Sequence, residues 1–406
     1  MKDVRQKACP CGGRLFALNK YHIAAADRMF YNKKRDNIGK RGNHMLSVCI
    51  ITKNEEENIQ KCLECLKPYG LPVVVVDTGS TDKTKEVVRA YTDSLYDFAW
   101  CDDFAAAKNY AVSKAGTPYV MVLDSDEFVE QLDVSELQKQ LLAHPGEVGR
   151  IRRRNLFTRD GEKKENREWI NRIFAKEEFS YQGRIHEQVT ERNGREYETY
   201  KTSVVISHCG YDLTPEKRKE KAKRNETLLL AELERLEGAP EGSSEEAQIP
   251  YILYQLGKSC YMAKEYETAC VWFEKGLSYD LNPALEYVID MVETYGYALL
   301  NSGQAETALL FESIYDEFAK SADFHFLMGL IYMNNERFED AAAEFMRATG
   351  YQESRSVGAN SYLAYYNIGV IRECLGQTDE AISYYKKCAG YAPAKMRIES
   401  LTSGKN

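Results

Sequence analysis

The chain lacks any long apolar stretch. Its longest hydrophobic runs, 71-LPVVVV-76 and 119-YVMVL-123, have the length of a strand and are far too short to cross a bilayer. Residues 1–25 include basic side chains but no apolar core of the size that a secretory signal needs. These absences lead us to expect a cytoplasmic protein without a membrane span.

An excess of positive charge is also missing. The net charge of −8 argues against non-specific binding to nucleic acid. With 44% hydrophobic and 29% charged residues, the composition is that of a globular protein. Since 406 residues exceed one ordinary core, we expect at least two domains.

The eleven cysteines form no disulfide or zinc pattern. Their number is odd, and most lie beside apolar neighbours in predicted helices or strands, as reduced buried thiols do. The close pairs are Cys9-Pro-Cys11, which has no matching second pair, and Cys62-x-x-Cys65, which lies on a predicted helix without a redox-fold context. Neither indicates zinc.

Composition and patterning divide the chain into segments. Residues 1–44 are rich in Lys, Arg, Gly and Asn without periodicity, and we expect a poorly ordered or atypical extension. Residues 45–237 form the next predicted domain, which ends in a connecting helix over 213–237. The stretch 238–248 is a linker by composition, and 249–400 is a region of helical repeats.

From 46 to about 210 the pattern alternates between strands and helices. β-branched strands at 46–51, 73–77 and 118–123, with a short strand near 94–98, are separated by amphipathic segments of helical length. This alternation predicts an α/β, Rossmann-like domain with a mostly parallel sheet covered on both faces. Ligands of such sheets bind at the carboxyl ends of the strands, where Thr52, Asp77 and Asp124 fall.

The region after 249 repeats a glycine, an alanine twelve residues later and an aromatic residue four beyond that. The copies are Gly257/Ala269/Phe273, Gly329/Ala341/Phe345 and Gly369/Ala381/Tyr385, with a degenerate copy at Gly296/Ala308 that carries Phe311. This spacing is typical of the tetratricopeptide repeat, in which small residues mark the contact between paired helices. The alternative is a generic helical bundle.

Four acids cluster where the strand over 118–123 ends, namely Asp124, Asp126, Glu127 and Glu130. Because carboxylates repel one another, these acids are either solvated or hold a cation. At a ligand-binding edge, oxygen ligands suit Mg²⁺ or Mn²⁺ bridging a diphosphate. The alternative is a helix N-terminus decorated with acids.

A second set of polar residues lies in 50-IITKNEE-56 and 77-DTGSTDKT-84. A Gly-Ser-Thr turn between a strand and a helix presents N–H groups and hydroxyls to a nucleotide. It is neither Gly-x-Gly-x-x-Gly nor a Walker loop, which disfavours dinucleotides and ATP-driven phosphoryl transfer. Asp77 can accept hydrogen bonds from a base or a ribose.

These motifs resemble those of a known family. IITKNEEENI, VVDTGSTDKT, DDFAAAKNYA and LDSDE occur in this order and are followed by 171-NRIFAKEEFSYQGRIHEQV-189 and 206-ISHCGY-211. Together they resemble the family-2 nucleotide-sugar glycosyltransferases of GT-A type. With the repeats, the chain looks like the tetratricopeptide-bearing branch that includes the peptide S-glycosyltransferase of the bacteriocin sublancin. The resemblance covers about 46–240 by motif.

The resemblance implies an inverting hexosyltransferase of the bacterial cytoplasm that uses a UDP-sugar. It implies residues that bind the nucleotide sugar (Thr52, Asn54, Asp77, Lys108 and Asp124). Asp126 would be the main ligand of Mg²⁺ or Mn²⁺, with Asp124 and His208 beside it. Many relatives carry Arg where this chain has Lys108.

The acceptor base is predicted at 183-GRIHEQ-188. Inverting attack needs a base on the far side of the sugar from the diphosphate, and motif and chemistry indicate Glu187, with His186 as its neighbour. A thiol acceptor would need less help, since cysteine is partly ionised near neutrality. The alternative reading of the His-Glu pair is a surface salt bridge.

The repeats predict what the enzyme acts on. Tetratricopeptide arrays form concave surfaces for extended peptides, which favours a peptide or protein acceptor that receives the sugar on Ser, Thr or Cys. In relatives the repeats also mediate homodimers. Two alternatives stay open: a cell-envelope glycan or lipid-linked acceptor, and a peptide-binding scaffold whose transferase domain is inactive.

Overall fold

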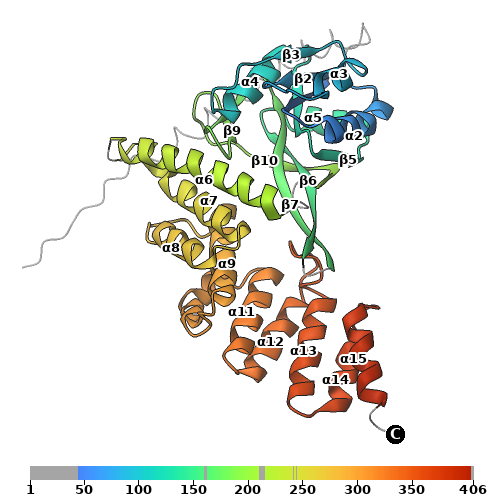
Figure 1. Cartoon of the computed structure of the whole chain (residues 1–406), viewed down its shortest axis with the longest axis vertical. Coiled ribbons are helices and arrows are strands. Elements are labelled where there is room, and N and C mark those ends of the chain that lie inside the picture. The colour runs from blue at the N-terminus through green and yellow to red at the C-terminus, as the bar shows by residue number, and fades with distance from the viewer. Residues whose placement is uncertain (1–43, 160–161, 210–214, 241, 244, 404–406) are drawn as a thin grey trace, which may run out of the picture.

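The computed structural model describes residues 44–159, 162–209, 215–240, 242–243 and 245–403. An α/β domain is joined by one long helix, α6 (Pro215–Glu237), to an array of helical hairpins (Figure 1). The predicted extension over 1–44, with Cys9 and Cys11, falls almost entirely outside the described residues. The nine cysteines that are described are free thiols, as expected.

The α/β domain is built on an eight-stranded sheet with the order β3-β2-β1-β4-β7-β6-β10-β5. The strands are β1 (Leu46–Thr52), β2 (Val73–Asp77), β3 (Leu95–Asp97), β4 (Tyr119–Asp124), β5 (Glu127–Gln131), β6 (Val148–Arg159), β7 (Glu162–Ala175) and β10 (Thr199–His208). Strands β1 to β4 pair in parallel, as do β6 and β10. β7 is antiparallel to β4 and β6, and β5 is antiparallel to β10.

Helices cover both faces of the parallel half of the sheet. They are α2 (Glu56–Leu66), which runs into the 3-10 turn η1 (Lys67–Tyr69), α3 (Thr84–Arg89), α4 (Phe104–Lys114) and α5 (Val134–Ala143). Alternate residues of β1 enter different cores, because side chains of a strand point to opposite faces. Val48 and Ile50 pack with α2 and α5, whereas Cys49 and Ile51 pack with α4. The predicted α/β domain with both faces covered is confirmed.

The alternation of strands and helices predicted as far as about 210 ends at α5. The next described elements are β6 and β7, which form a long hairpin, the small β8–β9 pair (Phe179–Gln182 and Gln188–Glu191), and β10. The hairpin is held largely by cross-strand charge pairs. Arg153 binds Glu168 and Arg154 binds Glu165, so its sequence lacks the apolar pattern of a core strand.

The C-terminal domain consists of antiparallel helix pairs. After the 3-10 turn η2 (Glu246–Gln248) within the predicted linker come α7 (Ile249–Met262), α8 (Tyr266–Leu277), α9 (Glu286–Asn301), the 3-10 helix η3 (Thr307–Ile314), α10 (Tyr315–Phe318), α11 (Ala322–Asn334), α12 (Phe338–Ala348), α13 (Tyr362–Cys374), α14 (Thr378–Lys386) and α15 (Ala392–Ser403). Within the described ranges, no helix is both long enough and apolar enough to span a bilayer.

The repeated glycines lie where paired helices touch. A Cβ on Gly257 would lie 2.5 Å from the ring of Phe273, and one on Gly329 would lie 2.7 Å from Phe345. The same clash, at 2.5 Å, would occur between Gly369 and Tyr385. In the degenerate copy, α9 is followed by a 3-10 helix instead of an α-helix. The spacing read from the sequence therefore records actual helix–helix contacts.

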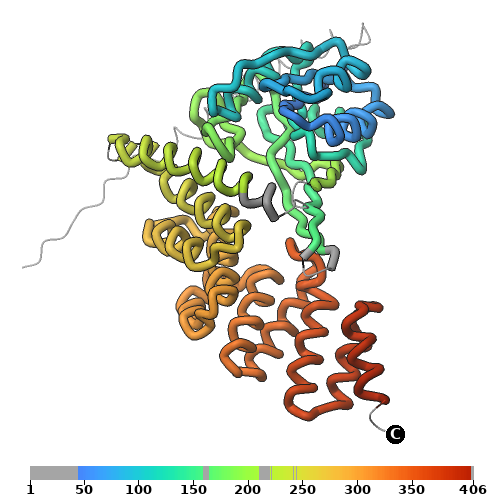
Figure 2. The backbone as a smooth tube through the Cα atoms, in the orientation of Figure 1, coloured from blue at the N-terminus to red at the C-terminus, as the bar shows by residue number. Residues whose placement is uncertain are grey.

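The array contacts the α/β domain in at least three regions, of which the third is an ion pair of 2.6 Å between Arg150 of β6 and Glu286 of α9. In the first, the Tyr251 hydroxyl of α7 accepts a hydrogen bond of 2.6 Å from the Gln188 amide. In the second, the segment before α13 runs beside β7 at the end of the β6–β7 hairpin (Figure 2). There the Arg167 N–H donates to the Arg355 carbonyl (2.8 Å) and the Val357 N–H to the carbonyl of Glu165 (3.1 Å).

Candidate active site

Thr52 and Asp77 lie side by side at the carboxyl ends of β1 and β2. Both are buried, with 4% and 1% of their surface exposed. Asp77 Oδ1 accepts from the N–H groups of Gly79 (2.9 Å) and Ser80 (2.8 Å). Within the described chain, Thr52 Oγ1 and Asp77 Oδ2 have no hydrogen-bond partner. Two adjacent buried acceptors without partners are suited to a ligand that supplies donors.

Asn54, which we predicted to bind the nucleotide sugar, connects the loops at these strand ends. Its backbone is left-handed, with φ of 53°, a conformation that Asn tolerates. Its N–H donates to the Ser80 hydroxyl (2.9 Å), and its Oδ1 accepts from the N–H of Thr81 (2.7 Å). The Asn54 side chain therefore ties the loop after β1 to the loop after β2.

Lys108 of α4 lies between two carboxylates. Its Nζ is 2.8 Å from Asp124 Oδ1 and 2.6 Å from Glu187 Oε1, and the residue is 3% exposed. Burial lowers the pKa of Lys108, but the charges of Asp124 and Glu187 outweigh it and raise the pKa above the ordinary value. The ammonium therefore stays charged and holds the two acids near each other.

Asp124 receives a second cation from β7. Arg172 Nη2 lies 2.8 Å from Asp124 Oδ2 and 2.9 Å from Glu127 Oε1. Burial raises the pKa of Asp124, but Arg172 and Lys108 hold it well below the usual range. Both oxygens of Asp124 are thus engaged by basic side chains.

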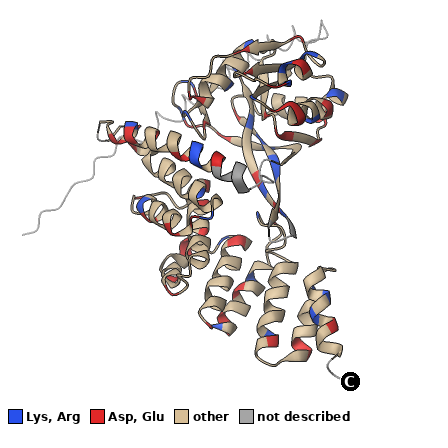
Figure 3. Cartoon of the chain, viewed as in Figure 1, with Lys and Arg blue, Asp and Glu red and all other residues tan. Residues whose placement is uncertain are grey.

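Basic side chains of the protein neutralise most of the acid cluster, a possibility that we did not expect from the sequence. We expected the acids to be either solvated or bound to a metal, but Glu127 is fully buried between Arg153 and Arg172. Glu130 pairs with Arg154 at 2.6 Å. The helix alternative is wrong, since Glu127 begins β5. These basic partners come from the β6–β7 hairpin, where Lys and Arg gather (Figure 3). The run 150-RIRRR-154, which contains Arg153 and Arg154, is a sequence signal for two of them that our expectations did not use.

Asp126 and His208 form the second part of the site. His208 Nε2 lies 3.3 Å from Asp126 Oδ2, and His208 Nδ1 lies 2.9 Å from Asn155 Oδ1. The three predicted metal ligands do not form one cluster, because Asp124 is held by Lys108 and Arg172. In the part of the chain that the structure describes, no three His, Cys, Asp or Glu side chains are arranged to hold an ion.

The Asp126–His208 pair nevertheless fits a divalent cation. A carboxylate oxygen faces an imidazole nitrogen across 3.3 Å, and both are ligands that Mn²⁺ accepts. Mg²⁺ and Mn²⁺ are commonly held by one or two protein groups, with water and substrate phosphates in the other positions. Two protein ligands are therefore sufficient if a diphosphate completes the site.

Glu187 and His186 lie next to the helical array. The Glu187 side chain is only 11% exposed and pairs with Lys108, so the surface salt bridge considered above is not what it forms. His186 has left-handed φ of 53°, and its carbonyl accepts from the Tyr251 hydroxyl at 3.3 Å. Helix α7 of the array thus reaches the residue that precedes Glu187.

Comparison with known proteins defines the class. Residues 47–202 match the model of glycosyl transferase family 2. Residues 322–355 and 362–395 match the tetratricopeptide repeat. The chain thus contains a domain that matches glycosyl transferase family 2, followed by a C-terminal region of tetratricopeptide repeats.

Particular relatives share parts of this arrangement. The prophage-derived glycosyltransferase SunS of Bacillus subtilis (strain 168) is 21% identical over 299 residues, which are 70% of this chain and 66% of SunS. The lipopolysaccharide core biosynthesis glycosyltransferase LpsC of Rhizobium meliloti is 33% identical over 107 residues, 25% of this chain and 39% of LpsC. A TPR repeat-containing protein of Synechococcus elongatus is 35% identical over 96 residues, 24% of each chain. The chain thus spans between a quarter and two thirds of these relatives.

Proposed function

We propose that this chain transfers a sugar from a UDP-sugar to a peptide or protein acceptor, with inversion at the anomeric carbon and with a divalent cation. The observation that carries the proposal is the Lys108 ammonium, which holds Asp124 and Glu187 together. Asp124 lies at the strand end where a donor binds, and Glu187 is the candidate base. One buried lysine therefore brings the proposed donor site and the proposed acceptor base next to each other.

The nucleotide and diphosphate would bind along the strand ends. The unpaired oxygens of Thr52 and Asp77 can accept hydrogen bonds from the nucleoside. Lys108 and Arg172 are buried cations nearby, but their charge is balanced by Asp124, Glu127 and Glu187. Asp126 and His208 would hold Mg²⁺ or Mn²⁺, and the bound cation would supply further positive charge to the leaving group.

Glu187 would remove the acceptor proton. Its partner Lys108 orients the carboxylate and can be displaced from it by the acceptor hydroxyl or thiol. Since a thiol is already partly ionised near neutrality, a cysteine acceptor would depend less on Glu187 than a serine or threonine would.

A peptide acceptor is supported by the position of the repeats. Tyr251 of the first repeat helix contacts Gln188 and the His186 carbonyl, on either side of Glu187. Tetratricopeptide arrays bind extended peptides on their concave surface, so an acceptor held there would approach the base. The similarity to SunS extends over most of the chain and agrees with this assignment.

A cell-envelope glycan is the second candidate acceptor, and the identity with LpsC favours it. The two are separated by supplying a radiolabelled UDP-sugar to a lysate of the native host that contains the purified enzyme. Label in protease-sensitive material supports the peptide acceptor. Label that enters only lipid or polysaccharide fractions contradicts it.

Release of UDP tests the transfer itself. The purified chain with Mn²⁺ and a panel of UDP-sugars is expected to release UDP, and both EDTA and Asp126→Ala are expected to abolish this release. Glu136→Ala is a control, because that carboxylate is 46% exposed and pairs with Lys139 on the same helix. If no UDP-sugar is turned over, the scaffold alternative replaces our proposal. Turnover that persists in EDTA would contradict the proposed metal dependence.

Glu187→Gln tests the base. The variant is expected to lower kcat at least a hundredfold while leaving KM for the donor nearly unchanged, since general-base catalysis acts in the transition state. Steady-state rates with a saturating acceptor measure both constants. An unaltered kcat would exclude Glu187 as the base.

A further inference from the structure

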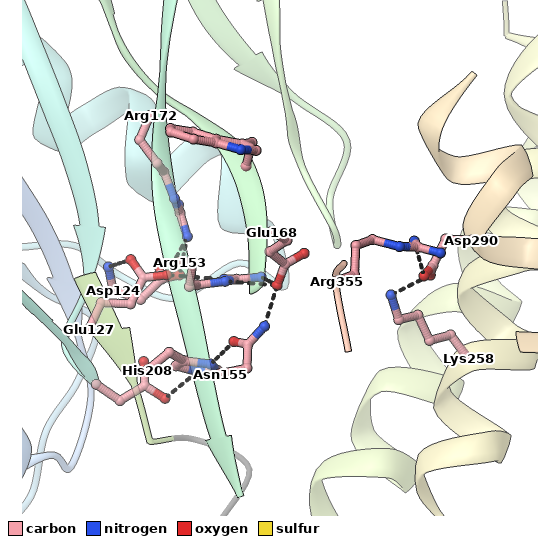
Figure 4. A network of polar contacts seen from close by, with 12 residues as sticks. Asp124, Glu127, Arg153, Asn155, Glu168, Arg172, His208, Lys258, Asp290 and Arg355 are labelled. Carbon is pink, nitrogen blue, oxygen red and sulfur yellow. Dashed lines mark hydrogen bonds and ion pairs between the residues drawn. The ribbon is translucent and has the colours of Figure 1, made fainter. Parts of the chain in front are cut away.

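A chain of hydrogen bonds leads from Asp126 out of the site to β7. His208 lies between Asp126 Oδ2 (3.3 Å from Nε2) and Asn155 Oδ1 (2.9 Å from Nδ1). Asn155 Nδ2 donates to Glu168 Oε1 at 2.5 Å, and Arg153 Nη2 donates to the same oxygen at 2.8 Å. Asn155 therefore stands between His208 and Glu168 (Figure 4).

Between Glu168 and His208 Nδ1, the donors and acceptors have only one consistent direction. Burial raises the pKa of Glu168, but the charges of Arg153 and Lys258 outweigh it and lower the pKa to about 2. An ionised carboxylate only accepts, so the Asn155 amide nitrogen must face Glu168 and its carbonyl oxygen must face His208. That carbonyl also only accepts, and His208 Nδ1 must therefore carry the hydrogen.

We propose that Glu168 and Asn155 are positioning residues that hold His208 as the Nδ1–H tautomer, with the lone pair of Nε2 directed at a divalent cation shared with Asp126. The inference rests on the metal dependence proposed above and adds the residues that prepare the ligand. Neither Glu168 nor Asn155 touches the reacting atoms. A metal-binding imidazole commonly donates its other N–H to such a partner, which fixes the ring.

The network also gives the β6–β7 hairpin a role. Asn155 lies on β6 and Glu168 on β7, and Arg153 joins Glu168 to the buried Glu127 beside the site. The charge of Lys258 on α7 also acts on Glu168. Both the hairpin and the first repeat helix therefore contribute to the state of one imidazole.

Glu168→Gln tests the proposal, because a neutral amide can donate as well as accept and no longer fixes the orientation of Asn155. In the presence of a fixed, saturating concentration of UDP, the Kd of the full chain for Mn²⁺, measured by electron paramagnetic resonance of the free ion, is expected to rise at least tenfold. Glu165→Gln is the matched control on the same strand, since Glu165 pairs with Arg154 and Arg167. It is expected to leave this Kd unchanged.

A double variant supplies the rescue. Asn155→Asp combined with Glu168→Gln moves the carboxylate by one position and reverses the hydrogen bond between these two side chains, while position 155 still accepts from His208 Nδ1–H. The Gln amide then donates to the new carboxylate at position 155, which accepts from Nδ1–H. We expect the Mn²⁺ affinity to return to within about threefold of the unmodified protein, whereas a merely structural loss at Glu168 would not be recovered.

The tautomer can be read without metal. Nitrogen-15 NMR of the metal-free chain with labelled histidine, assigned with His208→Asn, is expected to show a hydrogen on His208 Nδ1 and to lose this pattern in Glu168→Gln. An Nε2–H tautomer in the unmodified protein overturns the proposal, as does an unchanged Mn²⁺ affinity in Glu168→Gln. If the unmodified chain with UDP does not bind Mn²⁺, the proposed metal dependence fails, and the NMR result alone decides the role of Glu168 and Asn155.

Discussion

Asp77→Asn changes one atom at the base of the candidate nucleotide site. Asp77 Oδ1 accepts two backbone N–H groups, so the amide oxygen of the variant has to take that position. The amide nitrogen then replaces Oδ2, the buried oxygen without a partner in the described chain. An acceptor becomes a donor while the shape of the residue and the loop contacts are kept.

The size of the effect follows from this exchange. A hydrogen bond to a charged acceptor contributes roughly 1.5–3 kcal/mol, and two buried donors facing each other lose that contribution. At 1.4 kcal/mol per factor of ten, the Kd for UDP is expected to rise about 10- to 150-fold. Because Oδ1 keeps its two backbone partners and Lys85 keeps its closer pairing with Asp97, the melting temperature is expected to change little.

Titration calorimetry with UDP and Mn²⁺ measures this change. UDP methylated at the N3 position of uracil serves as a second ligand, since it has no N–H to donate. It should bind weakly to the unmodified chain and no more weakly to Asp77→Asn. Equal UDP affinity in the variant and the unmodified protein would refute the reasoning that the unpaired oxygen receives the base.

Three further outcomes are expected. Phe345→Ala removes a fully buried ring from its contact with Gly329 and should cost the array about 3–5 kcal/mol in denaturant unfolding, against less than about 0.5 for the exposed neighbour in Met346→Ala; similar losses would contradict the packing. The pKa of Glu168 is about 2 in the folded chain and 4.5 when the group is unpaired. The ionised carboxylate therefore stabilises the fold above pH 4.5, and this stabilisation is lost as the pH falls toward 2. The stabilisation is at most roughly 3 kcal/mol, and solvent screening reduces it because the side chain is 32% exposed. The difference in free energy of unfolding between the unmodified chain and Glu168→Gln should therefore shrink by at least half between about pH 7 and pH 3. A constant difference would disprove this pairing. Finally, EDTA should weaken the binding of UDP at least tenfold but leave that of uridine unchanged. Equal effects on both ligands would contradict a metal that binds the diphosphate.

The parts of the structure that could be predicted from the sequence are those that depend on local sequence patterns. The buried strands were legible because their residues are almost all β-branched or apolar, and Thr52 and Asp77 follow from where those strands end. The repeats could be predicted because contacting residues such as Gly329 and Phe345 are separated by a fixed number of residues within one helical hairpin. Neither inference needs to know which distant segments meet.

The missing parts depend on contacts between distant segments. Arg153 is opposite Glu168 only because of the register of the β6–β7 hairpin, and a charged strand gives no apolar signal for that register. The same holds for Arg172, whose partner Asp124 lies on β4. Without those partners, the acids after β4 looked as if they needed a metal to be close together. Side-chain cations were the simpler answer for Asp124 and Glu127.

The charge balance of the site nevertheless argues that a metal is needed once a donor is bound. Three basic side chains (Lys108, Arg153 and Arg172) meet five carboxylates (Asp124, Asp126, Glu127, Glu168 and Glu187), which leaves a formal charge of −2. The basic groups are therefore already committed to neutralising acids. A diphosphate brings further negative charge into a buried region, where Coulomb repulsion is screened far less than in water. A divalent cation at Asp126 and His208 would offset this charge without breaking the ion pairs that hold Glu187 in place.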